Sequence, residues 1–143
     1  MGAKSKLAGR TGEKDIVKTV RCPNCGRRLM QLPEGYPLFD VQCTGCVFRA
    51  QVKVNNCKTK DQIFGSGWDI MEKNLRIGQL IPPLIVKFHW REGRQSKEVI
   101  LFFPFLTKAN LKQKKRSQYG LRPGYKEFNY VGLMDDKTPK VVL

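Results

Sequence analysis

The sequence predicts an α+β domain with a mixed β-sheet flanked by helices and a four-cysteine motif embedded in it. Two apolar runs, PPLIVKF and EVILFFPF, are rich in the β-branched and aromatic residues that favour strands. Short amphipathic segments near residues 13–20 and 68–77 favour helices. A chain of 143 residues is long enough for one domain with a buried core.

The first expected helix runs from Glu13 to Val20 and follows a flexible segment over residues 1–12. Thr11 is a suitable cap, and acidic residues favour the first turn of a helix. Apolar residues at positions 16, 17 and 20 share one helical face. Because residues 1–12 are rich in glycine, lysine and alanine, we expect the folded domain to span residues 13–143.

The next expected elements are a hairpin, a loop and a helix. Residues 37–54 predict two strands joined through a Cys-x-x-Cys turn. Residues 55–67 predict a loop that ends in two glycines. A second helix is expected from Trp68 or Asp69 to Ile77, because Gly78 provides a stop signal.

The C-terminal half predicts a central hairpin followed by shorter elements. LIVKFHW and KEVILFFPF form the expected hairpin, since REGRQS between them contains a turn-forming glycine. TKANLKQKKR begins with a capping threonine and predicts a short basic helix. SQYGLRPGYKEF predicts a loop, and NYVGL predicts a last strand.

The charge of the chain indicates the kind of partner. Lysine and arginine total 27 against 12 aspartates and glutamates, a formal net charge of +15. Such an excess attracts polyanions, of which nucleic acid is the commonest. Neither apolar run is long enough to span a membrane, and the basic N-terminus lacks the apolar stretch of a secretory signal. We therefore predict a cytoplasmic protein with no membrane partner.

A basic cluster is the predicted DNA contact, although such clusters are also found on solvated faces. Ser66, in the segment GSGWD, is a further candidate for donating to a phosphate, and a glycine turn leading into a helix is the simpler account of that segment. The members of the cluster are Lys108, Lys112, Lys114, Lys115 and Arg116.

The cysteines predict a metal site. Cys22 and Cys25 form one Cys-x-x-Cys pair, and Cys43 and Cys46 form a second pair after 17 intervening residues. Two such turns bring four thiolates to one centre, the closed tetrahedral arrangement of structural zinc, which we favour over redox dithiols. Cys57 has no partner and is expected to be an ordinary thiol.

The second cysteine pair also sets the register of the predicted hairpin. Pairing around its turn places Ala50 opposite Val41 and Gln51 opposite Asp40. Strand alternation then puts Asp40, Gln51 and Lys53 on one face. The spacing alone leaves two interpretations open, because such a face can be a solvated hairpin surface or a metal-dependent reaction site.

The reaction-site interpretation follows the metal-dependent phosphodiesterases of the PD-(D/E)xK kind. Mg²⁺ prefers hard oxygen ligands, which the Asp40 carboxylate, the Gln51 side chain and the Val52 carbonyl could provide. Lys53 would orient or help to deprotonate the attacking water and offset charge on the phosphorus. Glu13 is a candidate for the helical acid that nucleases of this fold often add, and a favourable acid at a helix N-terminus is an equally good account of it.

From CPNCG onward, the chain resembles the endonuclease domain of the Dpn-type methyladenine-dependent restriction enzymes and the related Dam-replacing proteins. The resemblance rests on Asp40-x-x-Cys43-x-x-Cys46-x4-Gln51-x-Lys53, with weaker similarity in LIVKFHW, VILFFPFLTKANL and YVGL. It implies a restriction-endonuclease-like PD-(D/E)xK fold without the winged-helix domain of those enzymes. That family commonly has glutamate at position 51, whereas Gln-x-Lys is similar to the Mrr-like methyl-directed restriction proteins.

We therefore expect a cytoplasmic, prokaryotic, Mg²⁺-dependent deoxyribonuclease, a restriction endonuclease of the type II or type IV kind, with structural zinc. Its expected partner is double-stranded DNA, and methylation-directed cleavage fits the resemblance. Cutting both strands requires two active sites or two visits, which is compatible with a homodimer on DNA. The alternative is a non-catalytic zinc-ribbon module that binds nucleic acid.

Overall fold

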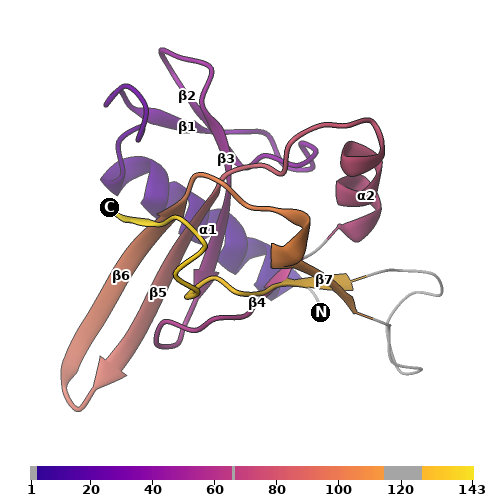
Figure 1. Cartoon of the computed structure of the whole chain (residues 1–143). Helices are drawn as coiled ribbons and strands as arrows, with labels where there is room; N and C mark the ends of the chain where they lie inside the picture. Colours follow the sequence, from indigo (N-terminus) through magenta and orange to yellow (C-terminus); the bar gives the residue numbers. More distant parts are fainter. Residues whose placement is uncertain (1–2, 66, 115–126) are drawn as a thin grey trace. The chain divides into compact units, whose positions relative to one another are not determined.

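Figure 1 shows the computed structural model, which describes residues 3–65, 67–114 and 127–143. The chain divides into two compact units. Unit 1 contains Met1–Thr59, Pro82–Pro104 and Lys140–Leu143, and unit 2 contains Lys60–Ile81 and Phe105–Pro139. The chain passes from unit 1 to unit 2 after Thr59 and again after Pro104, and it returns to unit 1 each time.

Unit 1 contains a six-stranded mixed sheet with the strand order β1-β2-β3-β5-β6-β9. The bounds are β1 Leu29–Gln31, β2 Val41–Cys43, β3 Arg49–Asn55, β5 Leu84–Glu92, β6 Gln95–Phe103 and β9 Val141–Val142. Strands β1, β2 and β3 pair antiparallel in turn, whereas β5 lies parallel to β3. Strand β6 pairs antiparallel with β5 and with β9. The predicted mixed sheet and both predicted hairpins are confirmed.

The two apolar runs of the sequence form β5 and β6. Gly93 closes this hairpin with a φ of 61°, a left-handed conformation that glycine adopts without strain. Leu84 and Val86 are fully buried on one face of β5, and Ile85 is fully buried on the other. Burial on both faces explains why this strand has a continuous apolar run and no alternation.

Helix α1 (Ala3–Thr19) packs on β1 and β3 and begins well before Glu13, the predicted start. The flexible segment predicted over residues 1–12 is therefore helical from Ala3. Ile16 and Val20 belong to a buried cluster with core residues of the sheet. Gly12 lies on the same side of the helix, against Val54 of β3. Glycine at this position permits close approach of helix and strand, although it lowers intrinsic helix propensity.

Gly12→Ala should lower the free energy of unfolding by about 1–3 kcal/mol, the usual cost of an overpacked contact. A Cβ at this position would lie 2.5 Å from Cγ2 of Val54, a branched side chain that moves little. Gly9→Ala is the matched control, because a Cβ there meets no atom within 4 Å. It should stabilise the protein by about 0.5–1 kcal/mol. Urea denaturation compares the variants, and equal effects would show that α1 does not pack closely on β3.

Unit 2 contains a three-stranded sheet with the order β4-β8-β7. Its strands are β4 Ile63–Gly65, β7 Leu111–Lys114 and β8 Glu127–Tyr130, and both pairings are antiparallel. Helix α2 spans Trp68–Arg76, and Gly78 follows it with a φ of 77°, as predicted. Strand β4 lies in the segment that the sequence predicted as a loop.

The short basic helix predicted from Thr107 onward is wrong. The chain forms one 3-10 turn, Lys108–Asn110, and continues as β7. The Oδ1 atom of Asn110 accepts from the backbone N of Thr107 (3.0 Å), and its Nδ2 donates to the Val131 carbonyl (2.9 Å). These bonds end the turn and direct the next residues into pairing with β8. The predicted loop that follows lies largely outside the described residues.

Candidate functional site

The four predicted zinc ligands lie together at one end of the β2–β3 hairpin. Their Sγ atoms are all within 4.8 Å of one another. The Cys25 and Cys43 Sγ atoms are 3.4 Å apart, and those of Cys22 and Cys46 are 3.6 Å apart. Zn–S bonds of about 2.3 Å would place tetrahedral ligands about 3.8 Å apart. The cluster can therefore hold a metal ion such as zinc.

Tight turns bring each pair of thiols to this centre. In the first turn, the backbone N of Gly26 donates to the Cys22 carbonyl (2.8 Å), and Gly26 has a φ of 78°. In the second turn, the backbone N of Gly45 donates to the Cys43 Sγ (3.3 Å). Cys57 is half-buried and stands outside the cluster, as expected.

The electrostatics of the cluster favour a bound cation. The side-chain amide of Asn24 donates to the Cys46 Sγ (3.5 Å) and lowers the pKa of that thiol to about 6. Burial raises the pKa of the Cys22 thiol. Four thiolates at this spacing repel one another, so a divalent cation is needed before all of them can ionise.

The cysteine cluster adjoins the hairpin that positions the predicted polar residues. Val41 pairs with Ala50, and the backbone N of Asp40 donates to the Ala50 carbonyl (2.9 Å). This is the register predicted from the cysteine spacing. The turn between Cys43 and Cys46 closes the same hairpin. A metal ion bound at this turn would therefore also hold Asp40 beside β3.

Asp40 lies just before β2, where its side chain reaches the backbone of β3. Its Oδ2 accepts a hydrogen bond from the backbone N of Val52 (2.8 Å). Burial raises the pKa of the Asp40 carboxyl, an effect opposed by this hydrogen bond and by the charges of Lys53 and Arg10. The carboxylate is thus held in place by one oxygen, and no described residue donates a hydrogen bond to Oδ1.

Lys53 and Glu13 complete a charged group around Asp40. Burial lowers the pKa of Lys53, and the nearby charges of Asp40 and Glu13 raise it. Burial raises the pKa of Glu13, whose Oε2 accepts from Gln31 Nε2 (2.9 Å) and lies 3.7 Å from Arg10 Nη1. The carboxylates of Glu13 in α1 and Asp40 just before β2 therefore interact electrostatically with the Lys53 amine in β3.

Arg10 and Gln31 were missed by the sequence analysis. The Nε2 atom of Gln31 also donates to the Arg10 carbonyl (3.1 Å), so Gln31 links α1 to β1. Arg10 and Glu13 stand three residues apart on one helix. This spacing indicates an ion pair on one helical face, but the expected helix began only at Glu13 and did not include Arg10.

Gln51 and Val52, the other predicted Mg²⁺ ligands, lie in β3 directly before Lys53. The backbone N of Gln51 donates to the Pro83 carbonyl (2.9 Å), and Gln51 pairs with Leu84 of β5. Gln51 is half-buried and Val52 is buried. The strand thus brings both residues next to the charged group, and their role as ligands stays a prediction.

The predicted DNA-contact residues belong to unit 2, whereas the charged group belongs to unit 1. Lys108 begins the 3-10 turn and Lys112 is in β7, and both are exposed. The backbone of Lys114 belongs to β7. Ser66, Lys115 and Arg116 lie outside the described residues.

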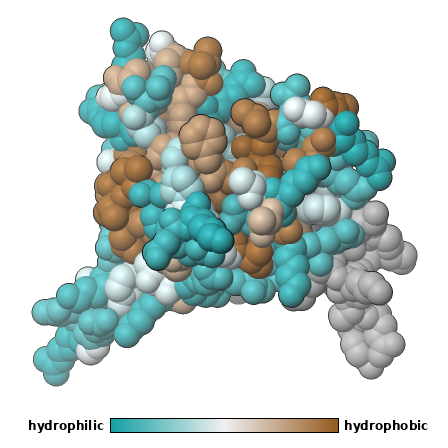
Figure 2. All heavy atoms as spheres, in the orientation of Figure 1, coloured by the Kyte–Doolittle hydropathy of each residue, from teal (hydrophilic) through white to brown (hydrophobic). Residues whose placement is uncertain are grey.

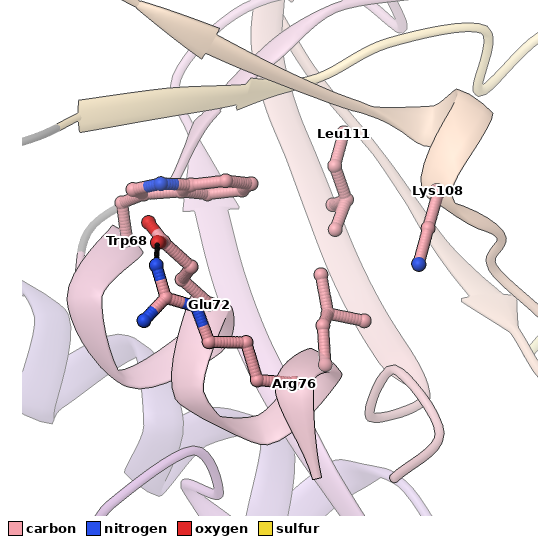
Figure 3. Close-up of a pocket in the computed structure, with 6 residues that line it drawn as sticks. Trp68, Glu72, Arg76, Lys108 and Leu111 are labelled. Atoms are coloured by element: carbon pink, nitrogen blue, oxygen red, sulfur yellow. Dashed lines mark hydrogen bonds and ion pairs between the residues drawn. The ribbon is translucent and has the colours of Figure 1, made fainter. Parts of the chain in front are cut away.

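Lys108 also lines a shallow hollow of unit 2, with a volume of about 280 Å³ (Figure 3). Trp68 and Leu111 form apolar parts of its wall, and Arg76 is paired with Glu72 at its edge. Arg76 thus has an acidic partner, whereas Lys108 pairs with no acid among the described residues.

These observations define a mixed α/β protein with a four-cysteine cluster that can hold a metal ion. No protein-family model matches the chain, and no curated protein matches it. Among the described residues, no helix is long and apolar enough to cross a membrane.

Proposed function

We propose that this protein is a Mg²⁺-dependent DNA endonuclease of the restriction type, stabilised by zinc in its four-cysteine cluster. The observation that carries the proposal is the grouping of Glu13, Asp40 and Lys53 around the start of β3. Holding three half-buried ionisable groups together costs free energy that a structural role alone rarely justifies, and such groups concentrate at reaction sites. The net charge of +15 supports a polyanionic substrate.

The oxygen atoms near β3 suit Mg²⁺. Asp40 offers Oδ1, because its Oδ2 is engaged with Val52 N. The side-chain oxygen of Gln51 and the carbonyl of Val52 are the further ligands of the proposal, and all are hard oxygen donors. Bound Mg²⁺ would supply Lewis acidity toward the scissile phosphate.

Lys53 serves the attacking water in this proposal. Its lowered pKa means that the amine gives up its proton more readily than an exposed lysine does. In the protonated form, it offsets the negative charge that grows on the phosphoryl oxygens. Water attacks phosphorus and gives up a proton to the neutral Lys53 amine. The P–O bond to the leaving sugar oxygen breaks, and that oxygen takes up a proton from solvent. Glu13 adds a second carboxylate beside Lys53 and Asp40.

Plasmid DNA should be cut in the presence of Mg²⁺, and the Mg²⁺ concentration for half-maximal rate should rise as the pH falls. The pKa values of Asp40 and Glu13 are raised above the ordinary 3.8 and 4.5, so protons compete with Mg²⁺ at a higher pH than for exposed carboxylates. Titrations of Mg²⁺ from about pH 8 down to about pH 5 measure this effect.

Omission of Mg²⁺ from the buffer, without a chelator, provides the control, since cutting should stop when Mg²⁺ is absent and return when it is restored. Asp15→Asn removes an exposed acid of α1 outside the charged group and should leave the Mg²⁺ requirement unchanged. DNA binding without cutting at any Mg²⁺ concentration would favour the alternative, a zinc-ribbon binding module. The cysteine cluster and the positive charge are sufficient for that function.

A further inference from the structure

The β5–β6 hairpin extends beyond the other strands of unit 1 (Figure 1). Strand β3 accompanies β5 only as far as Phe88, which pairs with Asn55. Strand β9 pairs with β6 only at Leu101 and Phe102. Residues 89–98 therefore form a two-stranded ribbon, which no described strand borders.

This ribbon is hydrophilic and exposed. Every residue from 91 to 98 is exposed, and Figure 2 shows the hydrophilic end of the hairpin at the lower left. A two-stranded ribbon is marginally stable without further support. Here Glu92 accepts from Trp90 Nε1 (3.2 Å) and pairs with Lys58 Nζ (3.5 Å). These contacts hold the ribbon in its extended shape.

The acids of the ribbon are engaged, and its arginines are not. Glu92 pairs with Lys58, and Glu98 pairs with Lys87 Nζ (3.2 Å). Neither Arg91 nor Arg94 pairs with an acid among the described residues. Lys97 has only a weak electrostatic interaction with Glu92. The ribbon therefore presents positive charge to the solvent.

The cations are distributed around the ribbon and not along one face. In the register of the hairpin, Arg91 lies opposite Ser96, and Lys97 lies opposite Trp90. Because adjacent residues of a strand point to opposite faces, Arg91 and Lys97 lie on opposite faces. Arg94 lies at the tip, next to Gly93. A ribbon resting on a flat anionic surface needs charge on one face, whereas a ribbon inside a groove meets phosphates on both sides.

We propose that the β5–β6 ribbon enters the major groove of duplex DNA. This inference rests on the proposed function for its choice of DNA as partner. The major groove, about 12 Å wide, admits a two-stranded ribbon, whereas the minor groove, about 6 Å wide, does not. Arg91 and Lys97 contact the phosphates of the two groove walls, and Arg94 and Gln95 at the tip meet base edges. Arginine and glutamine are suited to guanine and adenine in that groove.

The ribbon and the proposed reaction site belong to the same sheet of unit 1. Lys53 pairs with Val86, which lies on the strand that leads to Gly93. At roughly 3.3 Å per residue, the tip lies about 23 Å along the strand from the level of Lys53. That distance corresponds to about seven base-pair steps of DNA. One sheet can therefore hold a groove contact and a cleavage site on a single duplex.

The test removes the three cations in the Asp40→Ala protein without Mg²⁺, so that binding is measured without cutting. Arg91→Gln, Arg94→Gln and Lys97→Gln together should weaken binding to a duplex of about 25 base pairs by at least tenfold in fluorescence anisotropy. The slope of log Kd against log salt should fall by about 2, as two phosphate contacts are lost. Methylation of guanine N7, which lies in the major groove, should weaken binding of the parent protein but not that of the triple variant.

A matched control carries Lys14→Gln, Lys18→Gln and Arg21→Gln, three exposed cations of unit 1 outside the ribbon, and should keep the parent slope. Equal slopes for the ribbon variant and the parent overturn the inference, as does an equal loss of affinity for single-stranded DNA or duplex RNA. Plasmid cutting by the wild-type chain is measured separately. If the wild-type chain cuts DNA while the ribbon variant binds normally, the ribbon inference fails and the nuclease proposal stands. If binding depends on the ribbon and cutting is absent, the nuclease proposal fails alone.

Discussion

Cys43→Ser should abolish metal binding and cooperative unfolding of this protein. The substitution removes one of four Sγ atoms that lie within 4.8 Å of one another. Zinc binding at a structural site contributes about 10–16 kcal/mol, while the whole stability of a domain is about 5–15 kcal/mol. Losing the site therefore removes as much free energy as the folded state has. Zinc content measured by atomic emission, together with thermal unfolding, checks this prediction.

Cys57→Ser provides the matched control, because Cys57 is half-buried and lies outside the cluster. It should retain one zinc ion per chain and unfold cooperatively near the wild-type midpoint. A strong chelator should unfold the wild-type protein and the control alike. A Cys43→Ser protein that folds cooperatively without metal would contradict a structural role for the cluster.

The hairpin that contains Asp40 could be predicted in register, because two local constraints agree. The Cys-x-x-Cys turn is short and has a cysteine at each end, and strand alternation separates apolar from polar residues. Both constraints lie within residues 40–53, so no distant contact was needed. The observed pairing of Val41 with Ala50 follows from them.

The start of α1 could not be predicted in the same way. Gly9 and Gly12 lower the helix propensity of residues 3–12, and local sequence therefore favoured a flexible segment. The compensation comes from packing against β1 and β3, which are distant in sequence. For the same reason, the contacts of Arg10 and Gln31 with Glu13 were not anticipated.

The segment after Thr107 shows a second kind of failure. Its lysine-rich pattern favours a helix on propensity alone. Instead, Asn110 bonds to Val131 and β7 pairs with β8, both through residues far along the chain. Tertiary pairing thus overrides a local preference, and the predicted basic helix face does not exist at Lys108 and Lys112.

Asp40→Ala and Lys53→Ala should each abolish Mg²⁺-dependent cleavage of plasmid DNA while leaving zinc content and folding intact. In the proposed reaction, Asp40 provides the carboxylate beside β3, and Lys53 provides the amine that serves the attacking water. Removing a group that stabilises transition-state charge typically costs about 10²–10³ in rate, and loss of a metal ligand should cost more. DNA affinity without Mg²⁺ should hold or rise for Asp40→Ala, since a negative charge facing phosphate is removed. Single-turnover cleavage and anisotropy measure the two effects.

Two substitutions separate a catalytic role from a structural one. Asp40→Asn keeps an oxygen that accepts from Val52 N, so it should fold normally and still fail to cut. Gln51→Glu adds a charged oxygen ligand and should lower the Mg²⁺ concentration for half-maximal rate, whereas Gln51→Ala should raise it. Lys18→Ala removes an exposed lysine of α1 and should cut at the wild-type rate. Wild-type rates for both Asp40→Ala and Lys53→Ala would place the chemistry elsewhere, because neither charge would then contribute to cleavage.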